Sequence, residues 1–154
     1  MQINYYVCSS IHNRDLVRET YKRLNALGYN LILDWTHDSP GMSIPERVQK
    51  AREEAQAIME SNVVIVLLPT RFGSQTELGM AIASSMFENK RIFVWAEKDE
   101  DLYYMDGFDK GWYKNIFYYM PQVKVLKCPY DRLIEILEEE IHYFKNEISE
   151  CRRP

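Results

Sequence analysis

One short segment near the middle of the chain combines residue types that could bind and act on a small molecule. It runs from Pro69 to Ala81, directly after an apolar run, and places Gly73 and Ser74 just before Glu77. A glycine lets the backbone turn sharply and approach a ligand closely, and the start of a helix offers free N–H groups and a positive dipole end to an anion. This spacing predicts an anion-binding turn with the Glu77 carboxylate in the first helical turn, at the floor of a cleft.

A structural role explains the same carboxylate equally well. Ser74-Gln75-Thr76-Glu77 has the S-x-x-E form of a capping box, in which the glutamate side chain turns back to accept a hydrogen bond from the serine backbone N–H. The spacing does not choose between a carboxylate that faces a cleft and one that caps its own helix, so both interpretations stay open at this point.

The elements that must position this segment follow from an alternation of short β-rich runs and helical runs. Strands are expected over residues 3–8, 30–34, 62–68, 91–95 and 123–128, and helices over 13–27, 43–61, 74–87 and 129–148. The run 62–68 is apolar without alternation, which is typical of a central parallel strand covered on both faces. Residues 97–121 are acidic and then aromatic, and we expect a loop with a short helix there.

These elements define a fold class. Strands separated by helices of this length predict right-handed βαβ crossovers. We therefore expect one α/β domain over residues 1–154, with a flavodoxin-like, doubly wound, five-stranded parallel sheet in the order 2-1-3-4-5. Such sheets bind ligands beyond the carboxyl ends of the strands, at the switch point between strands 1 and 3. The loops 8–14, 34–41 and 69–77 should converge there.

Composition and charge limit the kinds of binding partner and the cellular compartment that we expect for the protein. The 154 residues are 46% hydrophobic and 27% charged, which is a globular composition, and the net charge of −4 argues against a nucleic-acid polymer as the partner. Cys8, Cys128 and Cys151 form no CxxC pair and suit a reducing compartment. The longest apolar run, 63–69, is too short to span a membrane. We expect a cytoplasmic protein with no membrane partner, metal site or cofactor.

Three stretches of the sequence match a known pattern in type and order. They are Tyr5-Tyr6-Val7-Cys8-Ser9-Ser10-Ile11, Ser61-Asn62-Val63-Val64-Ile65-Val66, and Gly73-x-x-x-Glu77-Leu78-Gly79-Met80-Ala81-Ile82-Ala83 followed by Asn89-Lys90-Arg91-Ile92. Together they resemble the nucleoside 2-deoxyribosyltransferase family, most nearly its branch of 2′-deoxynucleoside 5′-phosphate N-hydrolases. The resemblance extends over residues 1–95, and its most specific part is the E-L-G-x-A segment at Glu77.

The resemblance implies cleavage or transfer of an N-glycosidic bond in a nucleoside or nucleoside 5′-monophosphate. In the family, the glutamate of E-L-G attacks the anomeric carbon of the sugar and forms a glycosyl-enzyme intermediate, and Glu77 occupies that position. A carboxylate beside an oxocarbenium-like centre stabilises its charge and can trap it covalently. Tyr6 matches a first-strand tyrosine whose hydroxyl orients the nucleophile, although a strand aromatic is also commonly a core residue.

One departure from the family concerns the proton donor. The resemblance places Asn62 where the family has an aspartate that helps to protonate or hold the leaving base, and an amide cannot supply a proton. Asp34, His37 and Glu54 are candidates for a replacement acid, and each could equally be a solvated surface residue. If nothing replaces the acid, the chain could be a non-catalytic nucleotide-binding or sensing domain.

A second departure concerns the phosphate. Arg71 and Gln75 stand where the hydrolase branch has a serine and a second glycine, and Arg71 could either pair with a phosphate in bidentate fashion or be an exposed loop cation. Ser9, Ser10 and Asn13 match the family's sugar-phosphate region, and their alternative role is to cap the first helix.

The end of the second predicted strand completes the candidate binding residues. Asp34 and Trp35 would lie at the same sheet edge as the other loops. The flat indole of Trp35 could stack on a base, although tryptophan is also a common core residue.

Two further expectations concern the substrate and the assembly. TIR-like domains share this fold class and also place a glutamate on a helix in the cleft, so NAD is an alternative substrate. The stretch from Tyr103 to Tyr119 is rich in Tyr and Trp, which favour interfaces. The related enzymes are dimers or larger, and the resemblance therefore implies a homodimer or larger homo-oligomer.

Overall fold

A five-stranded, all-parallel sheet forms the centre of the protein, in a computed structural model that describes residues 2–39, 41–105 and 112–151. Its strands are β1 (Asn4–Ser9), β2 (Asn30–Leu31), β3 (Val63–Leu67), β4 (Arg91–Ala96) and β7 (Val123–Lys127), and their spatial order is β2-β1-β3-β4-β7. Every neighbouring pair is parallel. The predicted α/β class and the strand order 2-1-3-4-5 are confirmed, with β7 as the fifth strand.

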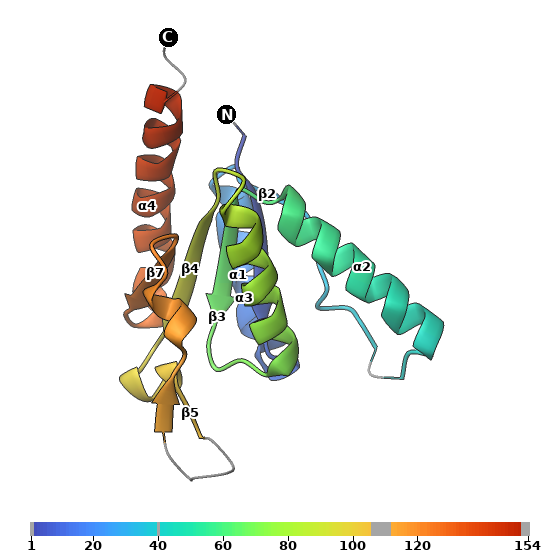
Figure 1. Ribbon diagram of the computed structural model, residues 1–154. Helices are drawn as coiled ribbons and strands as arrows, with labels where there is room; N and C mark the ends of the chain where they lie inside the picture. Colours follow the sequence, from blue (N-terminus) through green and yellow to red (C-terminus); the bar gives the residue numbers. More distant parts are fainter. Residues whose placement is uncertain (1, 40, 106–111, 152–154) are drawn as a thin grey trace.

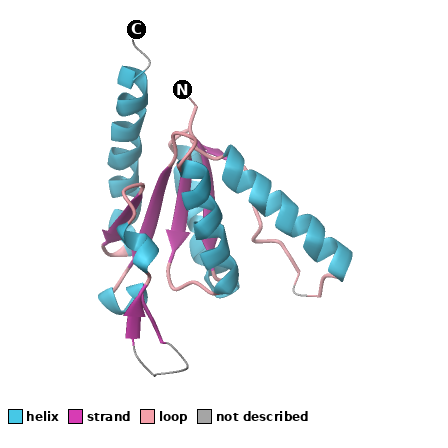
Figure 2. Cartoon of the chain, in the orientation of Figure 1, coloured by secondary structure: helices cyan, strands magenta, loops and turns pink. Residues whose placement is uncertain are grey.

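Four α-helices of the described residues cover the two faces of this sheet (Figures 1 and 2). The helices α1 (Arg14–Ala26) and α4 (Tyr130–Cys151) lie together on one face, and α2 (Ile44–Glu60) and α3 (Phe72–Ser85) pack against each other on the other. The neighbouring strands β1 and β3 therefore continue into helices on opposite faces. Their carboxyl ends form the switch point at which ligands bind in this fold class.

Side chains alternate along β1, and this alternation determines the face of the sheet to which each one points. Tyr5 donates a 3.3 Å hydrogen bond to the backbone carbonyl of Tyr21 on α1, so it points to the α1 face. Tyr6, the next residue, points to the opposite face and reaches α3. β3 is buried along its whole length, as its unbroken apolar sequence predicts.

The largest departures from the sequence prediction are in the second strand and in the region 97–121. β2 has two residues and ends before the predicted limit of Asp34, because Asp34 Oδ1 accepts hydrogen bonds from the backbone N–H and the hydroxyl of Thr36, at 2.9 and 2.6 Å, and closes a turn. The region 97–121 holds an antiparallel pair of strands where a loop and a helix were expected. Its elements are η2 (Asp99–Leu102), β5 (Tyr103–Met105), β6 (Trp112–Lys114) and η3 (Ile116–Tyr119), and Phe108 lies outside the described residues.

None of the helices over the described part of the chain combines the length and the apolar character that a membrane span requires.

Candidate active site

The Glu77 carboxylate meets the Tyr6 hydroxyl across the face of the sheet. The hydroxyl donates a 2.5 Å hydrogen bond to Glu77 Oε1. Helix α3 begins at Phe72, two residues before the predicted start, so Glu77 lies in the second helical turn and not the first. The capping-box interpretation is wrong, because the Ser74 hydroxyl donates to the backbone carbonyl of Ser9 at 2.8 Å and the carboxylate faces β1.

Burial changes the protonation equilibrium of this carboxyl group. Glu77 is 9% exposed, and the loss of solvation raises its pKa from 4.5 to about 7. The hydrogen bond from Tyr6 acts in the opposite direction because it stabilises the ionised form, and the negative charge of Glu54 adds to the rise. Burial and the charge of Glu77 raise the pKa of the Tyr6 hydroxyl, which therefore remains a donor at neutral pH.

A second carboxyl group, that of Glu54 on α2, acts electrostatically on Glu77. Its charge raises the pKa values of Glu77, Tyr6 and Cys8, which places it on the α2–α3 side of the sheet. Burial raises the pKa of Glu54 as well, and the neighbouring charge of Asp38 adds to this rise. A buried and a half-buried carboxyl group with raised pKa values are suited to acid–base chemistry. Of the three candidate acids, Glu54 is the one whose charge acts on Glu77.

The other two candidate acids lie in the second loop and act elsewhere. Asp34 is engaged in its own turn, and its second carboxylate oxygen lies 3.3 Å from His37 Nε2. The charge of Asp34 raises the pKa values of Tyr5, which faces α1, and of Tyr21 on α1. Trp35 is 8% exposed and its indole N–H donates a 2.6 Å hydrogen bond to the Val7 carbonyl, so most of its ring is packed in the core.

The first and third loops are joined by hydrogen bonds at the carboxyl edge of the sheet. Ser9 Oγ donates to the Leu67 carbonyl at 2.7 Å, and Asn13 Nδ2 donates to Ser9 Oγ at 3.0 Å and to the Pro69 carbonyl at 3.2 Å. Ser10 Oγ accepts the backbone N–H two residues further on, at 3.3 Å, and caps the short helix η1 (Ile11–Asn13). These polar residues hold the predicted loops together.

The start of α3 presents unused donors. Arg71, Phe72 and Gly73 are exposed, and the Arg71 side chain has no hydrogen-bond or ion-pair partner among the described residues. A Cβ atom added to Gly73 would meet nothing within 4 Å. Free backbone N–H groups and a guanidinium group therefore face open space, and both can bind an anionic group.

Asn62 lies at the amino edge of the sheet. It directly precedes β3, and its Oδ1 accepts a 3.0 Å hydrogen bond from the backbone N–H of Asn4 at the start of β1. Its own backbone bonds to Asn4 and Arg91 on the two neighbouring strands. Asn62 therefore joins the starts of three strands, and no hydrogen bond links it to Glu77.

Sequence reasoning missed Arg14, which begins α1 next to the first loop. One terminal nitrogen of its guanidinium group donates to the Asp38 carbonyl, and Nε is buried without a partner among the described residues. The Asp38 carboxylate in turn lies 3.3 Å from Lys50 Nζ on α2. These contacts tie the first loop, the second loop and α2 together. The only signal in the sequence is the position of Arg14 beside the switch point.

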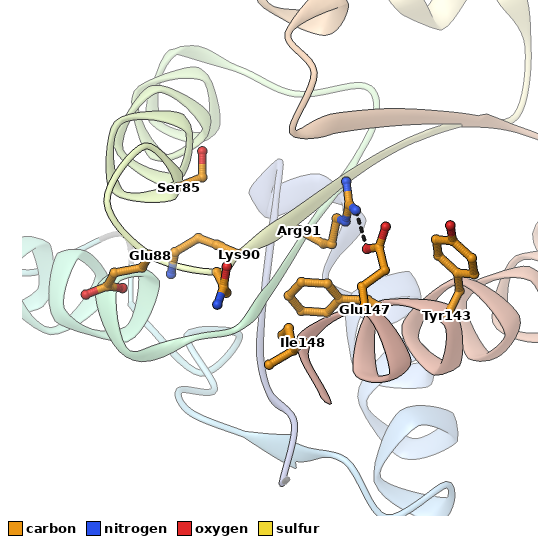
Figure 3. Close-up of a pocket in the computed structure, with 9 residues that line it drawn as sticks. Ser85, Glu88, Lys90, Arg91, Tyr143, Glu147 and Ile148 are labelled. Carbon is orange, nitrogen blue, oxygen red and sulfur yellow. Dashed lines mark hydrogen bonds and ion pairs between the residues drawn. The ribbon is translucent and has the colours of Figure 1, made fainter. Parts of the chain in front are cut away.

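A cavity of about 690 Å³ lies away from these residues, where β4 begins and α4 ends (Figure 3). It is lined by Ser85, Glu88, Asn89, Lys90, Arg91, Tyr143, Phe144, Glu147 and Ile148. Its two basic groups are already engaged, Arg91 by Glu147 and Lys90 by backbone carbonyls. None of the candidate site residues lines it. Among the described residues, no three His, Cys, Asp or Glu side chains gather where they could hold a metal ion.

The fold is that of doubly wound, flavodoxin-like α/β proteins, and one solved structure of this type shares it over most of the chain. This is the CMP N-glycosidase BcmB of Clostridium botulinum, which is 16% identical in sequence, with a TM-score of 0.53 over 89% of this chain and 98% of that chain. No protein-family model and no curated protein matches the sequence. At this identity the likeness establishes a common fold.

Proposed function

We propose that the protein cleaves the N-glycosidic bond of a nucleoside or a nucleoside 5′-monophosphate, with Glu77 as the nucleophile. The observation that carries the proposal is the buried hydrogen bond from Tyr6 to Glu77 Oε1, which orients the carboxylate and leaves Oε2 for the sugar. The E-L-G-x-A sequence around Glu77 and the fold shared with a CMP N-glycosidase support the same class of reaction.

The first chemical step forms a covalent bond to the enzyme. Glu77 Oε2 attacks C1′ of the sugar while the C1′–N bond breaks, and the electron pair of that bond stays with the leaving base. The Tyr6 hydroxyl holds the carboxylate in one orientation, and the buried setting strengthens its attraction to the positive charge that develops on the sugar. The product is a glycosyl ester of Glu77.

Glu54 is the proposed general acid and base, in place of Asn62. It gives its proton to the leaving base, and the resulting carboxylate then takes a proton from the water that attacks C1′. That second attack breaks the ester and regenerates the Glu77 carboxylate, whereas attack by a second base would complete a transfer. The active form therefore carries the proton on Glu54 and the charge on Glu77, which is one of the two ways of placing a single proton on the pair.

The 5′-phosphate is placed at the start of α3. Arg71 supplies a free guanidinium group, and the backbone N–H groups of Gly73 and Ser74 lie in the first helical turn. Ser9, Ser10 and Asn13 hold the adjoining loop, and Asp34 and Trp35 shape the second loop. Substrate, water and these side chains supply every bond and proton in the scheme, so no cofactor enters it.

Release of free base by the purified protein tests the proposal. Nucleosides, nucleoside 5′-monophosphates and their 2′-deoxy forms are incubated with the wild type, with Glu77→Gln and with Glu60→Gln, a control on an exposed glutamate of α2. We expect base release by the wild type and the control, and a loss of roughly 10³-fold or more in Glu77→Gln. Thermal stabilisation by nucleotides without turnover would instead indicate a binding or sensing domain, and release of nicotinamide from NAD would indicate a different substrate.

We also propose that the protein is a homodimer or a larger homo-oligomer. Apolar side chains at helical spacing lie along an outer face of α2, where Ile44 is 77%, Val48 46% and Met59 48% exposed, with Ala51 and Ala55 between them. Figure 1 shows α2 extending away from the body of the molecule. An apolar stripe on a projecting helix supports a contact with a second copy of the chain.

A further inference from the structure

Lys90 is a buried cation at the end of the sheet opposite the start of α3. It directly precedes β4 and is 4% exposed. Its ammonium group donates to the backbone carbonyl of Ile58 at 2.6 Å, to that of Met59 at 3.2 Å, and to that of Ser61. Figure 3 shows Lys90 beside Arg91 at this end of β4.

These three carbonyls belong to the last turn of α2 and the residue that follows it. A helix leaves its last four carbonyl groups without partners inside the helix, and its C-terminal end carries a partial negative charge. A lysine ammonium has three protons and satisfies three such groups at once. Burial lowers the pKa of Lys90, and the three hydrogen bonds and the nearby charge of Glu88 offset the cost of keeping the cation in the core.

Apart from its packing against α3 and the ion pair between Lys50 and Asp38, α2 is held to the body of the protein near its C-terminal end. Of its residues, all of which the structure describes, Ala57 and Ile58 are the buried ones, and both lie next to the Lys90 contacts. The N-terminal half of the helix is exposed from Ile44 to Gln49. Together with the packing of α2 on α3, the Lys90 contacts therefore hold the C-terminal end of the helix in place over the sheet.

Glu54 lies one helical turn before this end. Its side chain lies between those of Ala57 and Ile58 around the helix, so it points the same way as the two buried residues. We propose that Lys90 is a positioning residue for catalysis, because its hydrogen bonds to the end of α2 fix the position of Glu54 relative to Glu77. This inference rests on the proposed function, in which Glu54 protonates the leaving base.

The leaving group of the substrate separates this role from a general loss of structure. A neutral base needs a proton to leave, whereas a cationic ring leaves as a neutral molecule without one. We would use 7-methylguanosine 5′-monophosphate and nicotinamide mononucleotide as probes with cationic leaving groups, beside the nucleotide that the wild type cleaves best. Glu54→Gln calibrates the assay, since loss of a general acid costs about 10²–10⁴-fold on a neutral base.

Lys90→Met removes the three hydrogen bonds to the end of α2 and keeps most of the side-chain volume. Lys22→Met, on the exposed face of α1, is the matched control. We expect Lys90→Met to lower kcat on the neutral base about 10- to 100-fold, a part of the general-acid effect, and to change cleavage of the cationic probes less than about threefold. Hydrogen exchange of residues 44–60 should become faster than in the control, while exchange in α3 stays the same. If Lys90→Met does not fold, Lys90→Arg takes its place, because a planar guanidinium cannot reach the same three carbonyls.

The outcomes are distinct. Equal losses on neutral and cationic leaving groups, or unchanged exchange along α2, would overturn the positioning role of Lys90. A selective effect in Glu54→Gln but not in Lys90→Met would do the same and leave the proposed function intact. If Glu54→Gln itself has no selective effect, the proposed acid is wrong and this inference fails with it.

Discussion

At Glu77, burial and the Tyr6 hydrogen bond act on the pKa of one carboxyl group in opposite directions. Burial makes the carboxylate poorly solvated, and the hydroxyl keeps part of it ionised at neutral pH. The proposed role of Glu77 as a nucleophile needs both conditions, since only the ionised group attacks and a strongly hydrated one attacks slowly. Burial raises the pKa of the Cys8 thiol on the same face, which makes that thiol a poor nucleophile at neutral pH.

Replacing Tyr6 by Phe should shift the pH dependence of the reaction. A hydrogen bond to an ionised group is worth about 1.5–3 kcal/mol, or roughly one to two pKa units. Without it the pKa of Glu77 rises further above 7, so less of the carboxylate is ionised and the rate at pH 7 should fall about 10- to 100-fold. On a nucleotide with a cationic leaving group, which needs no proton from Glu54, the rate should keep rising to higher pH than in the wild type. The pH profile of kcat measures this, with Tyr5→Phe on the α1 face as the control. An unshifted acid limb would show that Tyr6 does not act on Glu77.

Glu77 should also make stability depend on pH. Its pKa is about 7 in the folded protein and close to 4.5 in the unfolded chain, so the folded state binds more protons between these values, and stability falls as the pH rises through this window. Glu77→Gln, which can still accept the Tyr6 hydrogen bond, should be more stable than the wild type above pH 7, by at most about 3 kcal/mol. The difference should nearly vanish at pH 4.5. Urea unfolding at several pH values measures this, and parallel curves for the two proteins would contradict it.

At the scale of elements, helix stability and ligand binding favour different residues in the first turn of α3. Alanine is favoured over glycine inside a helix by about 0.5–1 kcal/mol, and a methyl group on Gly73 would meet no protein atom. Glycine at this position is therefore suited to a ligand that approaches the backbone closely. The open space lies beside Arg71 and the free N–H groups.

Gly73→Ala should stabilise the protein slightly and weaken the binding of phosphate. We expect an increase of about 0.5–1 kcal/mol in the free energy of unfolding, and a KM for the nucleoside 5′-monophosphate that rises about tenfold, equivalent to about 1.4 kcal/mol. The KM for the nucleoside without phosphate should change little. Gly79→Ala is the matched control, because a Cβ atom there also meets nothing within 4 Å but lies almost two turns further along α3. An equal effect of both variants on KM would place the phosphate elsewhere.

Two segments of the same form show what a local pattern can predict. Ser43 and Glu46 form the capping box that opens α2, with Glu46 Oε2 accepting the Ser43 backbone N–H at 2.7 Å, as their spacing predicts. Ser74 and Glu77 have the same spacing but bond to Ser9 and Tyr6 instead. The first pair is exposed and has only local partners. The second pair faces β1, and such a contact depends on packing that spacing does not encode.

At the scale of the whole molecule, the sheet could be predicted from the sequence, but the electrostatic effect of Glu54 on Glu77 could not. The order of strands follows from the alternation of apolar runs and helices, which local sequence determines. The position of Glu54 against Glu77 depends on how α2 packs on α3, and no repeat in the sequence encodes that packing. Asn62 could have been placed, because a residue that precedes a parallel strand lies at the amino edge, away from the loops that bind ligands.

The apolar stripe on α2 belongs to the same scale, because none of the described residues covers it. A charge at its centre, Val48→Glu, would have to be buried in any contact made through α2, and we expect it to weaken self-association at least tenfold, equivalent to about 1.4 kcal/mol. Tyr143→Glu is the matched control, since Tyr143 is 63% exposed on α4 at the other face of the sheet. Sedimentation equilibrium over a range of concentrations measures the association. If Val48→Glu and the wild type associate equally, the stripe is not the contact, and any assembly must use another surface.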